Sequence, residues 1–142
     1  MTNLQRGDVY RQYLIEAVTA LDVIDPSLPP ELHDDGSVPF KLASGQVCFA
    51  NLNDGDEHYF RILCPFISTP ESDGERQKAA CAALAVCDEV KVAKVGFGGE
   101  ESLSACVEMF CDPSDVLPKI VFFRAIVAVR HAIQVFFEKM EE

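Results

Sequence analysis

The chain has 142 residues, close to the size of a typical single domain, and 49% of them are hydrophobic, which excludes wholesale disorder. Its 23 acidic and 12 basic residues give a formal net charge of −11, which repels phosphate backbones and anionic lipid surfaces. The composition therefore predicts one domain over residues 1–142, argues against nucleic acid and membrane as ligands, and favours a protein partner with a basic or apolar segment.

The first predicted element is an amphipathic helix over residues 8–21. Its apolar side chains recur at helical spacing, and polar side chains occupy the other side. The helix cannot continue through residues 25–30, because three prolines there lack the amide donor and disfavour helical geometry in the residues before them. A loop through residues 33–36 is expected to follow.

Strands are predicted over residues 38–42, 46–52 and 58–67. These segments are rich in aromatic and β-branched residues, and they are separated by Ser44-Gly45 and by residues 53–56, which contain Asn, Asp and Gly. Such turn residues tolerate positive φ, so consecutive strands can reverse direction sharply. We therefore expect the three strands to form a meander.

A second helix and a hairpin are predicted next. Residues 77–86 contain five alanines, which favour a slim helix that can lie close to a sheet. Residues 90–97 and 102–110 then alternate in hydrophobicity like two strands, joined by a loop that contains Gly98 and Gly99. Cap candidates for the last helix follow at residues 112–115, with Pro118 expected within its first turn.

The last predicted helix, residues 114–141, is more apolar than a helix with one core face needs to be. Its polar side chains fall within an arc of roughly 140° at 100° per residue, and apolar residues project even there. We therefore predict that this arc contacts a partner, while Val129 and Phe136 on the opposite side belong to the core. The predicted protein interface consists of Ile120, Phe123, Arg124, Val127, Arg130 and His131.

A membrane span is the first alternative for this helix. Residues 116–137 are long enough to cross a bilayer, but Lys119, Arg124, Arg130 and His131 carry or can carry charges that are costly near its centre. Residues 1–8 contain charged side chains and no apolar run of the kind found in signal peptides. We therefore expect a cytoplasmic protein without a transmembrane segment.

Six cysteines raise the possibility of disulfides or a metal site. They form no C-x-x-C pair and stand apart from the three histidines, so no metal site is predicted. In a cytoplasmic chain they should be reduced, and most have apolar neighbours, as Cys48 has in Val47 and Phe49. Cys81 and Cys87 lie on different faces of a helix, which argues against a disulfide between them. We interpret the cysteines as structural.

Other candidate chemistry is weak. The segment Gly96-Phe97-Gly98-Gly99 joins two strands and lacks the Gly-Lys-Ser/Thr of a phosphate loop. In residues 51–57 the glycine comes one position early for a calcium loop, and no glutamate stands at the twelfth position. No cysteine and histidine are arranged as an activated pair. The sequence therefore predicts no catalytic residue, no cofactor and no enzyme activity.

The predicted order, α-β-β-β-α-β-β-α, indicates an α+β two-layer sandwich with a mainly antiparallel sheet. The second half resembles the secretion-chaperone-like superfamily, which includes type III secretion chaperones and YbjN-type bacterial proteins. The resemblance is carried by the end of the alanine-rich helix in Val86-Cys87-Asp88-Glu89, the strand 90–95, the turn Gly98-Gly99-Glu100-Glu101, the strand 103–110 and the long closing helix. It implies a small acidic dimer that binds protein and has no catalytic motif.

Two functions remain open from the sequence. The first is a non-catalytic chaperone or adaptor that holds an apolar segment of a partner protein. The alternative is a YbjN-type regulatory or structural homodimer without a secreted client, and an enzyme of unknown class is a distant third. A homodimer is expected in either main case, because large apolar patches are rarely left in water on a monomer.

Overall fold

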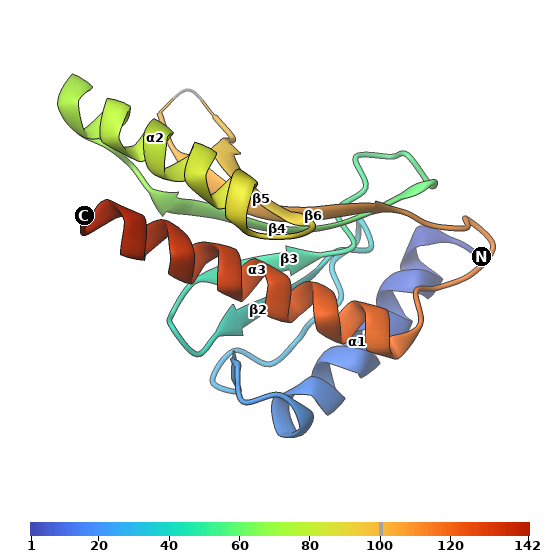
Figure 1. The fold of residues 1–142 in the computed structure, drawn as a ribbon. Helices are drawn as coiled ribbons and strands as arrows, with labels where there is room; N and C mark the ends of the chain where they lie inside the picture. Colours follow the sequence, from blue (N-terminus) through green and yellow to red (C-terminus); the bar gives the residue numbers. More distant parts are fainter. Residues whose placement is uncertain (100) are drawn as a thin grey trace.

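A computed structural model describes residues 1–99 and 101–142 (Figure 1). The fold is α+β, as predicted, with helices packed on an antiparallel sheet. One strand, β1, was not predicted, because a strand of two residues is too short to show alternating hydrophobicity. The elements are α1 (Asn3–Ala20), β1 (Ile24–Asp25), β2 (Val38–Leu42), β3 (Val47–Ala50), β4 (Tyr59–Ser68), α2 (Asp73–Glu89), β5 (Ala93–Phe97), β6 (Leu103–Phe110) and α3 (Lys119–Met140).

The strands form a single sheet in the order β1-β2-β3-β4-β6-β5, and every neighbouring pair is antiparallel. This order confirms the predicted meander of β2, β3 and β4 and the hairpin of β5 and β6. The hairpin joins the meander through β6, which pairs with β4, so β5 is an edge strand of the sheet. Gly98 donates a backbone hydrogen bond to Ser102 (3.1 Å) within the hairpin loop, in which Glu100 lies outside the described residues.

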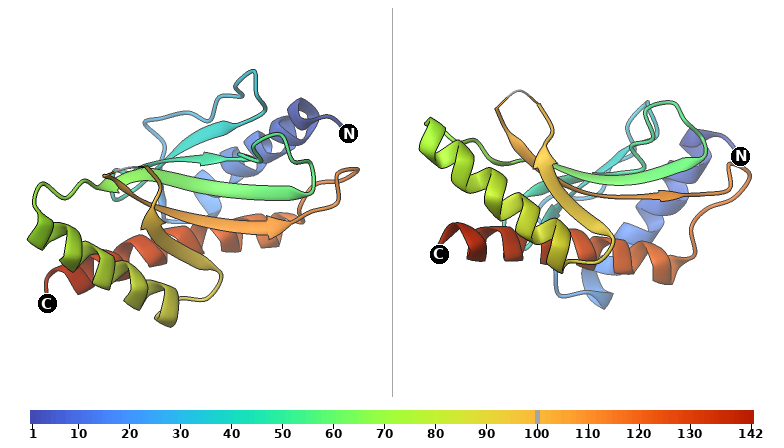
Figure 2. Two further views of the ribbon diagram at one scale, coloured as in Figure 1. Left: turned by 90° about the horizontal axis from the view of Figure 1, so that it is seen from above. Right: turned by 45° about the horizontal axis from the view of Figure 1, so that its top comes forward.

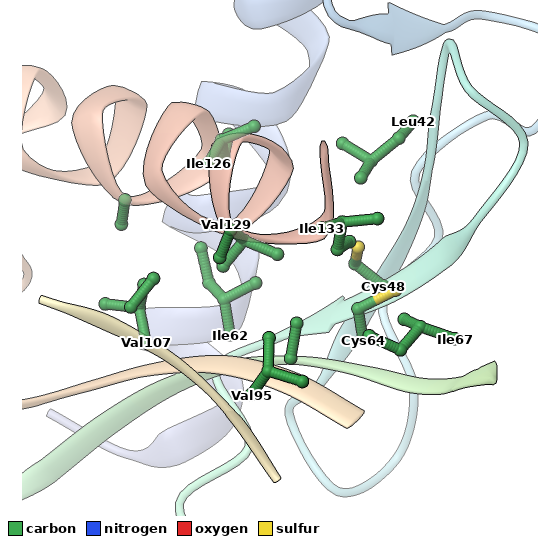
Figure 3. Packing of buried hydrophobic residues seen from close by; sticks show 14 of the residues in the cluster. Leu42, Cys48, Ile62, Cys64, Ile67, Val95, Val107, Ile126, Val129 and Ile133 are labelled. Carbon is green, nitrogen blue, oxygen red and sulfur yellow. The ribbon is translucent and has the colours of Figure 1, made fainter. Parts of the chain in front are cut away.

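All three helices cover the same face of the sheet (Figures 1 and 2). Helix α3 crosses this face with α2 on one side and α1 on the other. In the close view of the core, Val129 of α3 points toward the sheet residues Ile62 and Val107, and Ile133 lies beside Cys48 (Figure 3). All of these side chains are buried. One side of α3 is therefore a core surface, as the sequence predicted for Val129.

Tyrosines of α1 fix the beginning of α3. The Leu117 N–H donates to the Tyr10 hydroxyl oxygen (2.9 Å), and the Tyr13 hydroxyl donates to the Leu117 carbonyl (3.1 Å). The Tyr10 ring also stacks on Phe122 at 5.2 Å between centroids. Burial raises the pKa of Tyr10 to about 12, so its hydroxyl keeps its proton and its place in this contact.

The first two helices begin earlier than predicted. Helix α1 begins at Asn3, where the Thr2 hydroxyl accepts a hydrogen bond from the Gln5 N–H (3.1 Å) and the Gln5 side chain accepts one from the Thr2 N–H (2.7 Å). This first turn was missed because it buries Arg6 and Gly7 instead of apolar side chains. Helix α2 likewise begins earlier, at Asp73, after the cap residue Ser72.

The predicted start of α3 at residue 114 is wrong. Pro118 occupies the cap position without a side-chain hydrogen bond, and the helix begins at Lys119. The Asp112 carboxylate instead accepts hydrogen bonds from the N–H and the hydroxyl of Ser114 (2.9 and 2.7 Å), which closes a separate turn. These hydrogen bonds also lower the pKa of Asp112. Asp and Ser favour such local turns as much as helix caps, so the sequence did not distinguish the two.

The six cysteines all lie among the described residues, and all are free. Cys48 and Cys64 are buried on neighbouring strands with their sulfurs close together (Figure 3). The contact with Cys64 and the burial raise the pKa of Cys48 well above its usual value, so this thiol stays protonated. Cys81 and Cys87, in contrast, are exposed on α2. The structural interpretation thus fits the strand cysteines better than the helical pair.

By length and apolar composition alone, α3 could cross a membrane. In this fold, 44% of the residues in its most apolar stretch are buried within the protein. A core helix of a globular domain has the same composition, so the helix by itself does not point to a membrane.

Candidate protein-binding surface

A groove of about 770 Å³ runs along the outward side of α3. Most of the lining comes from α3, which we call the floor. The rest comes from Leu21 just after α1 and from residues 89–92, which lead from the end of α2 to β5, and we call these two segments the walls. The groove brings together five of the six predicted interface residues, and Arg130 lies exposed on the same helix but outside it. The lining residues are Leu21, Glu89, Val90, Lys91, Val92, Ile120, Phe123, Arg124, Val127, Ala128 and His131.

Large aliphatic side chains in this groove are left in contact with solvent. Ile120 is 62% exposed, Val92 68% and Val127 40%, and Phe123 beside them is half-buried. The opposite side of the same helix is different, because Val129 and Phe136 are fully buried. Single exposed apolar residues are ordinary, whereas several on one concave surface are typical of a binding site.

Val92 combines its exposure with an unusual backbone. Its φ is +71°, and the Ala93 N–H donates to the Lys91 carbonyl (2.8 Å), which closes a three-residue γ-turn around it. Left-handed geometry costs about 1–2 kcal/mol for a residue with a side chain, and β-branched residues adopt it rarely. The fold therefore holds a strained valine in solvent at the edge of the groove, a combination that often accompanies a functional site.

The variant Val92→Gly is expected to raise the free energy of unfolding by about 1 kcal/mol, because glycine adopts this φ without a steric penalty. The same variant should weaken partner binding, since it removes an exposed side chain from the groove wall. Urea unfolding measures the first effect. A loss of stability would show instead that the Val92 side chain packs favourably against α3.

The charged side chains that line the groove are mainly basic. Lys91 and Arg124 line it, and Arg130 lies nearby on α3. Within residues 1–99 and 101–142, none of these three makes a salt bridge. The one acidic lining residue, Glu89, is paired with Lys139 at 2.8 Å. On a protein with a net charge of −11, the groove is therefore a local basic region.

The open face of the sheet is a second candidate surface. Phe66 and Phe110 are each 77% exposed there, and Tyr59 lies beside Phe110 with ring centroids 4.9 Å apart. The charged side chains on this face pair with one another, because Glu108 contacts Arg61 at 3.7 Å and Lys94 at 3.3 Å. This face thus offers apolar area but neutralises its own charges.

A metal centre is the third possibility. In the described part of the chain, no group of three or more His, Cys, Asp and Glu side chains is placed to hold a metal ion. In residues 51–57, the Asn53 side chain accepts a hydrogen bond from the Gly55 N–H (3.1 Å), and Asp54 pairs with Arg61 at 3.0 Å. The oxygens of Asn53 and Asp54 thus have partners within the protein, and the segment forms a turn.

Sequence reasoning missed the walls of the groove. Leu21 ends an amphipathic pattern, and Lys91 and Val92 begin what reads as a strand, so neither segment signalled an exposed position. The floor could be predicted because helical periodicity indicates which apolar side chains of α3 do not face the core. The walls depend on segments far apart in the chain and carry no local signal.

No protein-family model and no curated protein matches the sequence. The structure is similar to the crystal structure of an uncharacterized protein from Methanothermobacter thermautotrophicus, with a TM-score of 0.57 and 16% sequence identity. The similarity covers 94% of this chain and 96% of that chain. At this identity it shows a shared fold, and the α+β architecture is therefore common to both proteins over nearly their whole length.

Proposed function

We propose that the protein is a non-catalytic chaperone or adaptor that holds an apolar segment of a partner protein in the groove along α3. The observation that carries this proposal is the exposure of Val92, Ile120 and Val127 on one concave surface. An amphipathic segment that lays its apolar face in such a groove is a common mode of protein recognition. The resemblance of the sequence to secretion chaperones favours the same kind of role.

The surface requires little rearrangement to receive a partner. Its floor is one continuous helix, held on the other side by buried residues such as Phe122, Ile126 and Val129. A rigid floor avoids the entropic cost of ordering a site on binding. Partner side chains can therefore gain their burial energy directly from the exposed aliphatic residues.

The alternative is a YbjN-type homodimer in which a second copy covers the surplus apolar surface. The open face of the sheet favours this alternative, because Phe66 and Phe110 would also be shielded by self-association. A dimer through the sheet face is compatible with a chaperone, whereas a dimer through the groove would replace the client. The two functions differ in what occupies the groove.

Photo-crosslinking from position 127 tests the proposal. A benzoylphenylalanine introduced there should capture one protein other than the chain itself, in stoichiometric amount, and Ile120→Ser should abolish the product. The same probe at Lys78, an exposed position on α2 outside the groove, serves as the matched control. Crosslinking only to a second copy supports a homodimer through the groove, and no crosslink specific to position 127 overturns the groove as a binding site for either occupant.

Self-association gives a separate prediction. At micromolar concentration, sedimentation should give a mass twice the 15.7 kDa of one chain, because the exposed apolar surfaces are larger than a monomer usually leaves in water. Light scattering over a tenfold range of concentration would check the mass. A mass that stays monomeric throughout this range would remove the argument for a dimer.

A further inference from the structure

We infer that the groove along α3 takes an acidic amphipathic segment, in which Asp or Glu residues flank the apolar side chains. This inference rests on the proposed function and names the partner chemistry of the same site. It reverses the expectation of a basic segment, which came from the net charge of the whole chain. The positions of Lys91, Arg124 and Arg130 carry it.

These three cations have no carboxylate partner in the described part of the chain. Acidic residues outnumber basic ones in this protein, 23 to 12, so unpaired cations gathered on one surface are unexpected. Glu89 cannot serve them, because its carboxylate contacts Lys139 at 2.8 Å. The groove therefore combines an apolar floor with positive charge that remains available to a partner.

Local charge outweighs net charge in such a contact. At physiological ionic strength the Debye length is about 8 Å, so acidic residues farther than this from the groove are largely screened from a segment within it. A carboxylate beside Arg124 or Lys91 interacts at contact distance and in a partly desolvated setting. Acidic flanks therefore strengthen binding, and basic flanks oppose it.

The same charges disfavour a second copy as the occupant. Two chains that met groove to groove would bring the basic side chains of both into one symmetric interface, where like charges repel. The acidic surface of another copy could enter only head to tail, and such contacts tend to build open chains instead of closed dimers. An acidic segment of another protein can fill the groove without like-charge repulsion and without building an open chain of copies.

Two synthetic peptides of equal length and identical apolar pattern test the inference. Leucines at helical spacing form the apolar face of both, with glutamates flanking it in one and lysines in the other. Fluorescence anisotropy on the full chain should show the glutamate peptide binding about tenfold more tightly at physiological salt, with the difference shrinking as salt rises.

The charge-reversed variant Lys91→Glu, Arg124→Glu should invert the preference between the peptides. Lys78→Glu makes the same kind of change on α2, away from the groove, and should leave the preference unaltered. Circular dichroism of each variant confirms that the fold is retained, since all three side chains are exposed.

Failure of the inference is distinguishable from failure of the proposed function. Equal affinities for the two peptides, both lost in Ile120→Ser, Val127→Ser, would overturn the acidic partner and leave the groove as an apolar docking site. Lack of binding by either peptide would also overturn the inference, because the stated chemistry should suffice for recognition. Crosslinking from position 127 decides the proposed function independently.

Discussion

The double variant Val129→Ser, Phe136→Ser is expected to lose about 5 kcal/mol or more of unfolding free energy, which approaches the total stability of a small domain. Both side chains are fully buried in the hydrophobic core, so their truncation opens cavities and places hydroxyls among apolar atoms. Urea unfolding at 25 °C measures the loss. A large fraction of the variant molecules should be unfolded even in the absence of denaturant.

The matched pair Phe123→Ser, Val127→Ser changes the same two residue types on the outward side of the same helix. Val127 is 40% exposed and Phe123 is half-buried, so this variant should lose only about 1–2 kcal/mol and keep a native circular dichroism spectrum. It should nevertheless bind its partner poorly, because the removed side chains line the groove.

Equal destabilisation of the two variants would be the informative contradiction. It would mean that Phe123 and Val127 contribute to the core as much as Val129 and Phe136 do. The partner surface would then lose its main support, whatever the peptides show.

Gly7→Ala is expected to destabilise the protein by about 1–3 kcal/mol, although alanine normally favours a helix over glycine. A Cβ at this position of α1 would overlap the Gly36 carbonyl oxygen and come within 2.6 Å of the Leu32 side chain. The carbonyl cannot easily withdraw, because it accepts a hydrogen bond from the buried Asn51 side chain (2.8 Å). Gly36 itself has a φ of +87°, which further restricts the loop.

Gly74→Ala provides the control within the same chain. Gly74 also lies in a helix, α2, but a Cβ there would meet open space. This variant should gain up to about 1 kcal/mol from the higher helix propensity of alanine. Thermal denaturation of both variants would measure the contrast, and a stabilising Gly7→Ala would show that the loop at Gly36 yields freely.

The sequence by itself determined the types of the elements and most of their order. Alternation along the strands and the helical period of the last segment follow from which side of each element is buried, so they identified the meander, the β5–β6 hairpin and the core position of Val129. The same periodicity separated Val127 from Val129 on α3. Local turn chemistry was less decisive, because Asp112 and Ser114 suit a turn and a helix cap equally well.

The tertiary structure alone decided where the segments meet. The sequence could not place β6 between β4 and β5, since strand pairing is a long-range choice with no local pattern. Nor could it show that Leu21 and Val92 line a groove on the outward side of α3, or that Lys91 and Arg124 both line that groove. A net charge is a sum over the chain, whereas a binding surface responds to the few charges within a Debye length, and only folding determines which charges those are.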